Sequence, residues 1–329
     1  ALTESEIEEL FKIIRDLRSR DIGIIYISHR MDEINVITDR VTVMRDGEYV
    51  GTIITKDSTK EEIISMMVGR TIYEDPKEKS NVPKDAPVVL KVENLNVGKS
   101  VRNVSFELKK GEIIGFSGLM GSGRTETARA IFGADKIDSG TIYVNGKKVE
   151  IKCPMDAVNS GIGYLSEDRK RYGIVLDKTV TENSTMSSLD KFVNGIFINK
   201  KKEKDVAKDY AEKLKTKTAS VETPVVTLSG GNQQKVVIAK WLIKDCDILI
   251  FDEPTRGIDV GAKSEIYTLM NELVAQGKSI IMISSELTEI LRMSDRIIVM
   301  NEGRKTGELP IEEATQESIM NAATLRNQF

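Results

Sequence analysis

The chain of 329 residues is long enough for about two domains. Its hydrophobic content of 40% and charged content of 30% are typical of a globular protein, and a net charge of −3 argues against a nucleic-acid-binding surface. No apolar run approaches the ~18 residues that a membrane-spanning helix needs. Two distant cysteines, Cys153 and Cys246, favour a reducing compartment over a disulfide framework.

The N-terminal segment repeats a pattern found near the C-terminus. ALTESEIEELFKIIRDL has apolar residues at helical spacing from its first positions, which predicts a helix. The stretch GIIYISHRMDEINVITDRVTVMRDGEYVG, from Gly23, aligns without gaps with SIIMISSELTEILRMSDRIIVMNEGRKTG, from Ser279, at an offset of 256. We interpret this as a duplication.

The duplication predicts a three-part organisation. Residues 1–73 would be the C-terminal remnant of a first domain, and the chain would be N-terminally truncated. Residues 74–87, EDPKEKSNVPKDAP, are polar, contain three prolines and are predicted to be a linker. Residues 88–329 would be a complete second domain. The alternative is a standalone protein with an N-terminal extension.

The second domain begins with predicted strands and a glycine-rich turn. VVLKVENL and VRNVSFELKKGEIIGFSG predict three strands, with a turn at Lys109–Gly111. GLMGSGRT then matches the phosphate-binding pattern G-x-x-x-x-G-K-[ST] except for Arg124. In such a loop backbone N–H groups face phosphate, and Thr125 would bind Mg²⁺. A glycine-rich turn without a ligand is the alternative. The candidate residues are Gly118, Gly121, Ser122, Gly123, Arg124 and Thr125.

Two further motifs carry acidic and anion-binding groups. DILIFDEP predicts a buried strand that ends in Asp252 and Glu253. Asp252 would hold Mg²⁺ through water, and Glu253 would orient or deprotonate an attacking water. LSGGNQQ opens a predicted helix whose start could bind an anion. Helix caps are the alternative for both motifs, but their combination in this order favours function.

Together these motifs resemble those of ABC-type ATPases. The loop at Gly118–Thr125 resembles Walker A, Asp252 and Glu253 resemble Walker B, and Gly257–Asp259 resembles the D-loop. Glu167 stands where the Q-loop glutamine is usual, and Ser285 where the switch histidine is usual. Ser229–Gln234 resembles the signature, in which Ser229, Gly230, Gly231 and Gln233 would contact the nucleotide.

The resemblance implies an α/β fold of the P-loop NTPase class. It implies a mixed sheet core, an antiparallel β subdomain and a helical signature subdomain at about 168–232, preceded by the C-terminal part of a second cassette. AKDYAEKL, at helical spacing, fits the helical subdomain, and Trp241 is interpreted as a core residue.

More narrowly, GLMGSGRTE, YLSEDRKRYGIVL and DEPTRGIDVGAK resemble fused two-cassette ATP-binding proteins of monosaccharide import. The ribose type is the most similar, and the galactose and xylose types are close. This resemblance implies ATP and Mg²⁺ as cofactors and transmembrane permease subunits as partners. A periplasmic or extracellular sugar-binding protein would be reached through the permease. The location would be peripheral, at the cytoplasmic face of the cell membrane. The alternative is a non-transport ABC ATPase that acts on ribosomes or DNA, against which the near-neutral charge argues.

Cassettes of this family pair head to tail, which predicts two unequal nucleotide sites. His29, the only histidine, aligns with Ser285 and would be the catalytic switch residue of the first site, opposite the signature of this chain. Residues 1–3 would be what this chain contains of the D-loop of the first cassette. In the second site the planar guanidinium of Arg124 replaces the compact ammonium of the usual lysine. In addition, no aromatic residue lies between Tyr73 and Phe106 to stack on the adenine of ATP. We therefore expect the second site to bind ATP and hydrolyse it slowly.

Overall fold

The computed structural model describes residues 4–28, 31–45, 48–59, 62–63, 66, 76–194 and 197–325. The chain divides into two compact units. The first comprises Ala1–Tyr73 with Asp259–Ser264, and the second comprises Glu74–Ile258 with Glu265–Phe329. In the described part of the chain, no helix combines the length and the apolarity that crossing a membrane requires.

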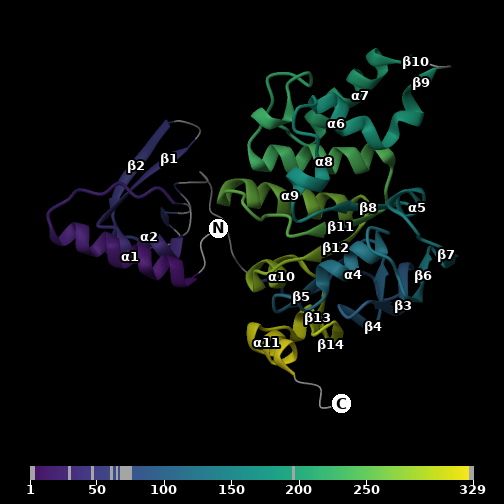
Figure 1. The fold of residues 1–329 in the computed structure, drawn as a ribbon, viewed down its shortest axis with the longest axis horizontal. Coiled ribbons are helices and arrows are strands. Elements are labelled where there is room, and N and C mark those ends of the chain that lie inside the picture. Colours follow the sequence, from purple (N-terminus) through teal and green to yellow (C-terminus); the bar gives the residue numbers. More distant parts are fainter. Residues whose placement is uncertain are drawn as a thin grey trace. The chain divides into compact units, whose positions relative to one another are not determined.

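The described residues of the first unit form two helices and a β-hairpin (Figure 1). Ile7, Phe11 and Ile14 are buried, at the helical spacing that places them on one face of the first helix. Ile25 and Ile27 are each 93% exposed, in a segment that is not a strand. The elements are α1 (Glu4–Ser19), α2 (Met31–Ile37), β1 (Arg40–Arg45), β2 (Glu48–Ile54) and a 3-10 helix (Thr55–Asp57).

The secondary structure repeats at the same offset as the sequence. The bounds of α1, α2, β1 and β2 correspond to those of α9 (Val260–Ala275), α10 (Leu287–Met293), β13 (Arg296–Asn301) and β14 (Arg304–Pro310). Even the register shift between Val43 and Met44 recurs, between Val299 and Met300. One element differs, because Ser279–Ile283 form the strand β12 whereas residues 23–27 form none. β12 is paired on both sides, and among the described residues of the first unit no strand pairs with residues 23–27.

A six-stranded sheet forms the core of the second unit, in the order β14-β13-β5-β12-β11-β8. All neighbours are parallel except β14, which is antiparallel to β13. The apolar runs of β5 (Ile113–Gly118), β8 (Ile162–Leu165), β11 (Ile248–Asp252) and β12 are buried, as expected of strands covered on both faces. Parallel pairing places the carboxyl ends of β5, β12 and β11 at one edge of this sheet.

A second, antiparallel sheet has the order β4-β3-β6-β7. The edge-to-face pair of Phe106 and Phe116, with ring centroids 5.1 Å apart, joins it to the core sheet. Helix α4 (Arg124–Ile131) contacts β3 as well as β5 and β11, so it packs between the sheets. The strands are β3 (Val88–Val97), β4 (Val101–Lys109), β6 (Ser139–Val144) and β7 (Lys147–Val149). The predicted strands and the turn after Lys109 are confirmed.

Helices gather at one end of the second unit, where Figure 1 shows α6, α7 and α8 together. This region contains the predicted helical stretch, and the helix that LSGGNQQ opens, α8, continues through KVVIAKWLI as predicted, whereas a short hairpin of β9 and β10 was not foreseen. Trp241 is buried, which confirms its interpretation as a core residue. The elements are a π-helix (Arg169–Gly173), α6 (Val180–Thr185), 3-10 helices (Met186–Phe192 and Val225–Thr227), β9 (Val193–Asn194), β10 (Phe197–Ile198), α7 (Lys200–Lys213) and α8 (Gly230–Lys244). Outside it lie α5 (Pro154–Asn159), a 3-10 helix (Ile311–Glu313) and α11 (Gln316–Thr324).

The segment expected to be a linker is bonded to the second unit. The Lys77 N–H donates to the Leu291 carbonyl at 3.0 Å, and Lys77 Nζ lies 2.6 Å from the buried Asp295 carboxylate. Ser80 Oγ donates to the same carboxylate at 2.9 Å. Residues 77–80 are therefore not a flexible linker, because hydrogen bonds and an ion pair fix them to α10 and to the residues that follow it.

A buried lysine lies in the middle of α8. Lys240 Nζ donates to the Gly173 carbonyl at 2.7 Å and lies 4.5 Å from the centre of the Trp241 ring. Burial lowers the pKa of Lys240 to about 8. Because the folded-state pKa lies below the unfolded value of 10.5, folding favours the neutral amine. The stabilising contribution of this group is therefore complete above the unfolded value and is lost as the pH falls through about 8.

Lys240→Met should remove this pH dependence. From pH 7 to pH 11 the free energy of unfolding of the wild type should rise relative to that of the variant, by up to ~3 kcal/mol. Urea denaturation at both pH values measures the difference. Lys208→Met, at an exposed position of α7, is the matched control and should show no such change. A constant difference between the wild type and Lys240→Met would contradict the prediction.

Candidate functional site

The loop between β5 and α4 passes through a narrow space. Gly118 has φ 147° and Gly123 has φ 96°, in the region that favours glycine. A Cβ on Gly118 would collide with the Met300 carbonyl oxygen, and one on Gly123 would collide with the Ser100 carbonyl oxygen. The glycines at these two positions are therefore required by the close approach of β13 and of the turn between β3 and β4.

The start of α4 is open to an anion. The N–H groups of its first turn have no intrahelical acceptors, as in any α-helix, and its N-cap residue, Gly123, provides no side-chain acceptor for them. Ser122 Oγ is buried and has no hydrogen-bond partner among the described residues. These N–H groups and the positive end of the helix fit a phosphate. The residues present thus fit the expected nucleotide.

Thr125 and Asp252 meet where β11 ends. Thr125 Oγ1 donates to Asp252 Oδ1 at 3.1 Å, and the Tyr164 hydroxyl donates to Asp252 Oδ2 at 2.7 Å. Burial raises the pKa of Asp252, against the opposing effect of these donors and of Arg124. A hydroxyl and a carboxylate are ligands that Mg²⁺ accepts. Among the described residues no three acidic, histidine or cysteine side chains form a metal site, so Mg²⁺ would need phosphate oxygens or water as further ligands.

Glu253 follows Asp252 in a strained turn. Its φ of 48° is unusual for a non-glycine residue, and its N–H donates to the Ile283 carbonyl at 2.9 Å. Ser285 Oγ donates to Glu253 Oε2 at 3.1 Å. Burial raises the pKa of Glu253, and hydrogen bonds from Ser285 oppose this rise. Although the serine is shorter than an imidazole, it still contacts the carboxylate expected to orient water.

Arg124 reaches across to the end of β12. Its Nη1 donates to the Ser284 carbonyl at 2.8 Å. Burial lowers the pKa of Arg124, opposed by the nearby carboxylates of Glu253 and Asp252, and an arginine remains charged nevertheless. The sequence did not predict this bond. It links Arg124 to the residue directly before Ser285, so two positions that depart from the family pattern lie next to one bond.

Glu167 lies in a second cluster. Its carboxylate forms an ion pair with Arg256, which follows the Walker B residues. Arg169 Nη1 donates to the Arg256 carbonyl at 3.1 Å, and a Cβ on Gly230 would lie 2.6 Å from Arg169 Nη2. Arg169 Nε also donates to Gln233 Oε1 at 3.4 Å. The acidic residue at the Q-loop position is thus neutralised, and Arg169, which sequence reasoning missed, joins that segment to the signature helix.

The signature residues are separate from the phosphate loop. Ser229 is the N-cap residue of α8, and its Oγ accepts from Asn232 Nδ2 at 2.9 Å. Within the described ranges no hydrogen bond joins Ser229, Gly230 or Gly231 to the loop at Gly118–Thr125.

The other predicted site residues lie in the first unit. Asp259 Oδ1 accepts from the Ala262 N–H at 2.9 Å, so Asp259 caps the start of α9. His29 and residues 1–3 lie outside the described residues.

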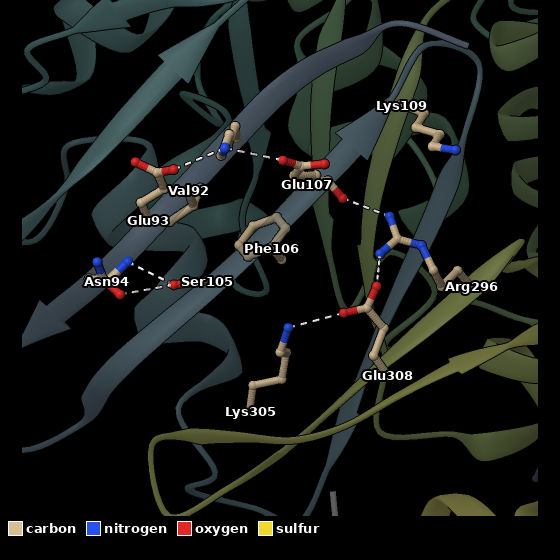
Figure 2. Close-up of a pocket in the computed structure, with 11 residues that line it drawn as sticks. Val92, Glu93, Asn94, Ser105, Phe106, Glu107, Lys109, Arg296, Lys305 and Glu308 are labelled. Carbon is tan, nitrogen blue, oxygen red and sulfur yellow. Dashed lines mark hydrogen bonds and ion pairs between the residues drawn. The ribbon is translucent and has the colours of Figure 1, made fainter. Parts of the chain in front are cut away.

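A surface groove of about 580 Å³ lies elsewhere, on β3, β4, β13 and β14 (Figure 2). Lys91 pairs with Glu93 at 2.9 Å, and Lys305 pairs with Glu308 at 3.0 Å. Arg296 also pairs with Glu308, and Lys109 Nζ donates to a backbone carbonyl. Each of the four cations that line the groove already has an acceptor, so we assign it no ligand.

The fold and the site define a P-loop nucleotide-binding domain. Residues 101–256 match the family model described as ABC transporter, and the ATPase domain of this chain belongs to that family. The predicted family and fold class are thereby confirmed for the second unit.

Two curated relatives align with almost the whole chain. A protein of Burkholderia cenocepacia (strain HI2424), provisionally named ribose/galactose/methyl galactoside import ATP-binding protein 2, is 57% identical over 99% of this chain and 64% of its own length. The ribose import ATP-binding protein RbsA of Clostridium tetani (strain Massachusetts / E88) is 54% identical over 98% of this chain and 64% of its own length. The chain spans 64% of the length of each of these two relatives.

Solved structures show the same fold. A nucleotide-free ATP-binding cassette from an ABC transporter has a TM-score of 0.61 at 25% identity, over 71% of this chain and 94% of the other. An ATP-binding cassette in its ADP conformation has a TM-score of 0.60 at 24% identity, over 72% of this chain and 95% of the other.

Asp252→Asn should stabilise the protein when nucleotide and Mg²⁺ are absent. Because the folded-state pKa of Asp252 is raised, its contribution to stability is present at acid pH and is lost as the pH rises through that pKa. We expect the variant to be more stable than the wild type at pH 7.5, with a difference that shrinks toward pH 4.

Urea denaturation at the two pH values measures this effect. Asp190→Asn, at an exposed carboxylate, is the control and should be neutral. In the presence of Mg²⁺ and ATP the wild type should gain more stability than Asp252→Asn. If the wild type is more stable than the variant at pH 7.5 without ligands, burial of the ionised Asp252 carboxylate does not destabilise the folded state.

Proposed function

We propose that this chain is part of the ATP-binding, energy-coupling subunit of an ABC importer for a monosaccharide. The observation that carries this proposal is the cluster of Thr125, Asp252, Glu253 and Ser285 at the open start of α4. It combines groups for phosphate, for a divalent cation and for water in one place. The names of the relatives support a sugar importer, and the ribose type is our specific proposal.

Each residue has a defined task in this proposal. Bound ATP would supply the phosphoanhydride bond that is hydrolysed. The N–H groups at the start of α4 hold phosphate, while Thr125 and Asp252 hold Mg²⁺. Glu253 orients water and accepts its proton, for which its raised pKa is suited.

Hydrolysis at this site should be slow. Arg124 is bonded to the Ser284 carbonyl, and a planar guanidinium does not replace a compact ammonium between phosphates. Ser285 carries no imidazole. Loss of one preorganised donor lowers a rate by about 10²–10³, and here three positions, Arg124, Glu167 and Ser285, differ from the family pattern. The site would therefore mainly bind nucleotide.

The first unit extends the proposal to a fused pair of cassettes. Residues 1–73 repeat α9, α10, β13 and β14, and we propose that they are the C-terminal part of a first cassette. In that cassette residues 23–27 would be a central strand, which accounts for the exposed Ile25 and Ile27. In this proposal the cassettes pair head to tail, and His29 would be the switch residue of the first cassette.

The partners follow from the importer proposal. Transmembrane permease subunits would bind the helical region, and a sugar-binding protein would be reached through them, with this subunit at the cytoplasmic face of the membrane. An ABC ATPase that acts on ribosomes or DNA is the alternative, and the net charge of −3 gives no support for it. Co-purification with membranes or with ribosomes distinguishes the two.

The nucleotide proposal is tested by ATP binding and turnover with Mg²⁺. We expect the wild type to bind ATP and to turn it over slowly, and Glu253→Gln to bind ATP without turnover. Arg124→Lys should bind at least as well, because lysine is the residue of the common loop pattern. Rapid wild-type turnover that Glu253→Gln abolishes would show that Arg124, Glu167 and Ser285 support hydrolysis, and the description of a mainly binding site would be wrong.

The cassette proposal is tested at Ile25 and Ile27. Replacing both with threonine should raise the solubility of this chain, because two exposed isoleucines become polar. ATP affinity of the second unit should not change. In a fused protein that contains the flanking strands, the same change should lower thermal stability, since the two side chains would be buried there. Unchanged thermal stability of the fused protein would contradict the proposal that residues 23–27 form a central strand there.

A further inference from the structure

The helix α10 carries a buried carboxylate that the proposed reaction does not use. Glu289 is 3% exposed. Its Oε1 accepts hydrogen bonds from Thr255 Oγ1 and from the Tyr267 hydroxyl, each at 2.5 Å. Its Oε2 accepts from Ser284 Oγ at 2.7 Å. One carboxylate thus joins the turn after β11, the helix α9 and the end of β12.

Ser284 connects this carboxylate to the nucleotide site. Its Oγ donates to Glu289 and accepts from the Glu286 N–H at 3.0 Å, which ties the Ser284 side chain to α10 and to its N-cap residue. The carbonyl of the same residue accepts from Arg124 Nη1 at 2.8 Å. The next side chain, Ser285, donates to Glu253 at 3.1 Å. A shift of Ser284 would therefore move the partner of Arg124 and a donor to Glu253 together.

The first unit contains the same pair. Glu33, which aligns with Glu289, is 7% exposed, and Ser28, which aligns with Ser284, donates to it at 3.0 Å. The Tyr26 hydroxyl also donates to Glu33, at 2.6 Å. Ser28 directly precedes His29 in the sequence, as Ser284 precedes Ser285.

The tyrosine in the two units comes from different positions. Tyr26 aligns with Met282, and Tyr267 aligns with Phe11. The first unit thus supplies its tyrosine hydroxyl from the segment before Ser28 and the second unit from α9, and both keep the serine–glutamate bond at the same place. Burial of a carboxylate is costly, and an apolar residue would pack in its place. A costly group that recurs with its serine partner indicates a role beyond packing.

We propose that Glu289 is a positioning residue for the nucleotide site, which holds Ser284 so that Arg124 and Glu253 keep their geometry. This inference rests on the proposed function, because the groups that Glu289 positions are those assigned to the terminal phosphate and to water. Glu289 itself touches none of the reacting atoms.

Two variants separate positioning from packing. Ser284→Ala and Tyr267→Phe each remove one hydroxyl donor from Glu289 at a buried position, but only Ser284 extends to the site. In the full chain with Mg²⁺, Ser284→Ala should lower the affinity for ATP about tenfold and leave that for ADP within about twofold. Tyr267→Phe should lower the melting temperature and leave the ratio of the two affinities unchanged.

A second measurement needs no nucleotide. A crystal structure of each variant without nucleotide reports the distance from Ser285 Oγ to Glu253 Oε2, which is 3.1 Å in the wild type. Ser284→Ala should lengthen this distance, because Glu289 no longer holds residue 284. Tyr267→Phe should leave the distance unchanged. Equal effects of the two variants on this distance, or no effect of Ser284→Ala, would overturn the positioning role. Failure of the wild type to bind ATP would instead refute the proposed function.

Discussion

The hydrogen bond from Arg124 to the Ser284 carbonyl is the contact on which the arrangement of the site depends. It crosses from the start of α4 to the end of β12, two places that are far apart in sequence. They are close because β5 and β12 are parallel neighbours, so that their carboxyl ends lie at one edge of the sheet. The same geometry brings Thr125 to Asp252 and Ser285 to Glu253.

Each unusual residue of the site has a partner inside the same unit. Glu167 is neutralised by Arg256, and Arg124 has both a backbone acceptor and two nearby carboxylates. Arg124 is partly buried, and its partners reduce the cost of burying its charge, whereas Glu167 and Arg256 form a partly exposed ion pair. A ligand that entered the site would compete with these internal contacts. Such competition would weaken the binding of a ligand at these positions.

The two units show how context changes one sequence pattern. Four elements of the first unit have the same relative bounds as their counterparts, including the register shift in the hairpin. Local sequence is sufficient for these elements because each buries its own apolar face within the unit. The segment at residues 23–27 differs from β12 because a central strand needs hydrogen-bond partners on both edges, which β5 and β11 provide only to β12.

The sequence by itself determined the elements and motifs whose signals are local. These include the strands around the phosphate loop, the strand that ends in Asp252, the helix that begins at Gly230 and the duplication. Tertiary structure alone decided the partners: Glu167 with Arg256, Arg124 with Ser284, and Glu289 with its three hydroxyls. Side-chain pairing depends on which strands become neighbours in the sheet, and no local pattern of residues specifies that order.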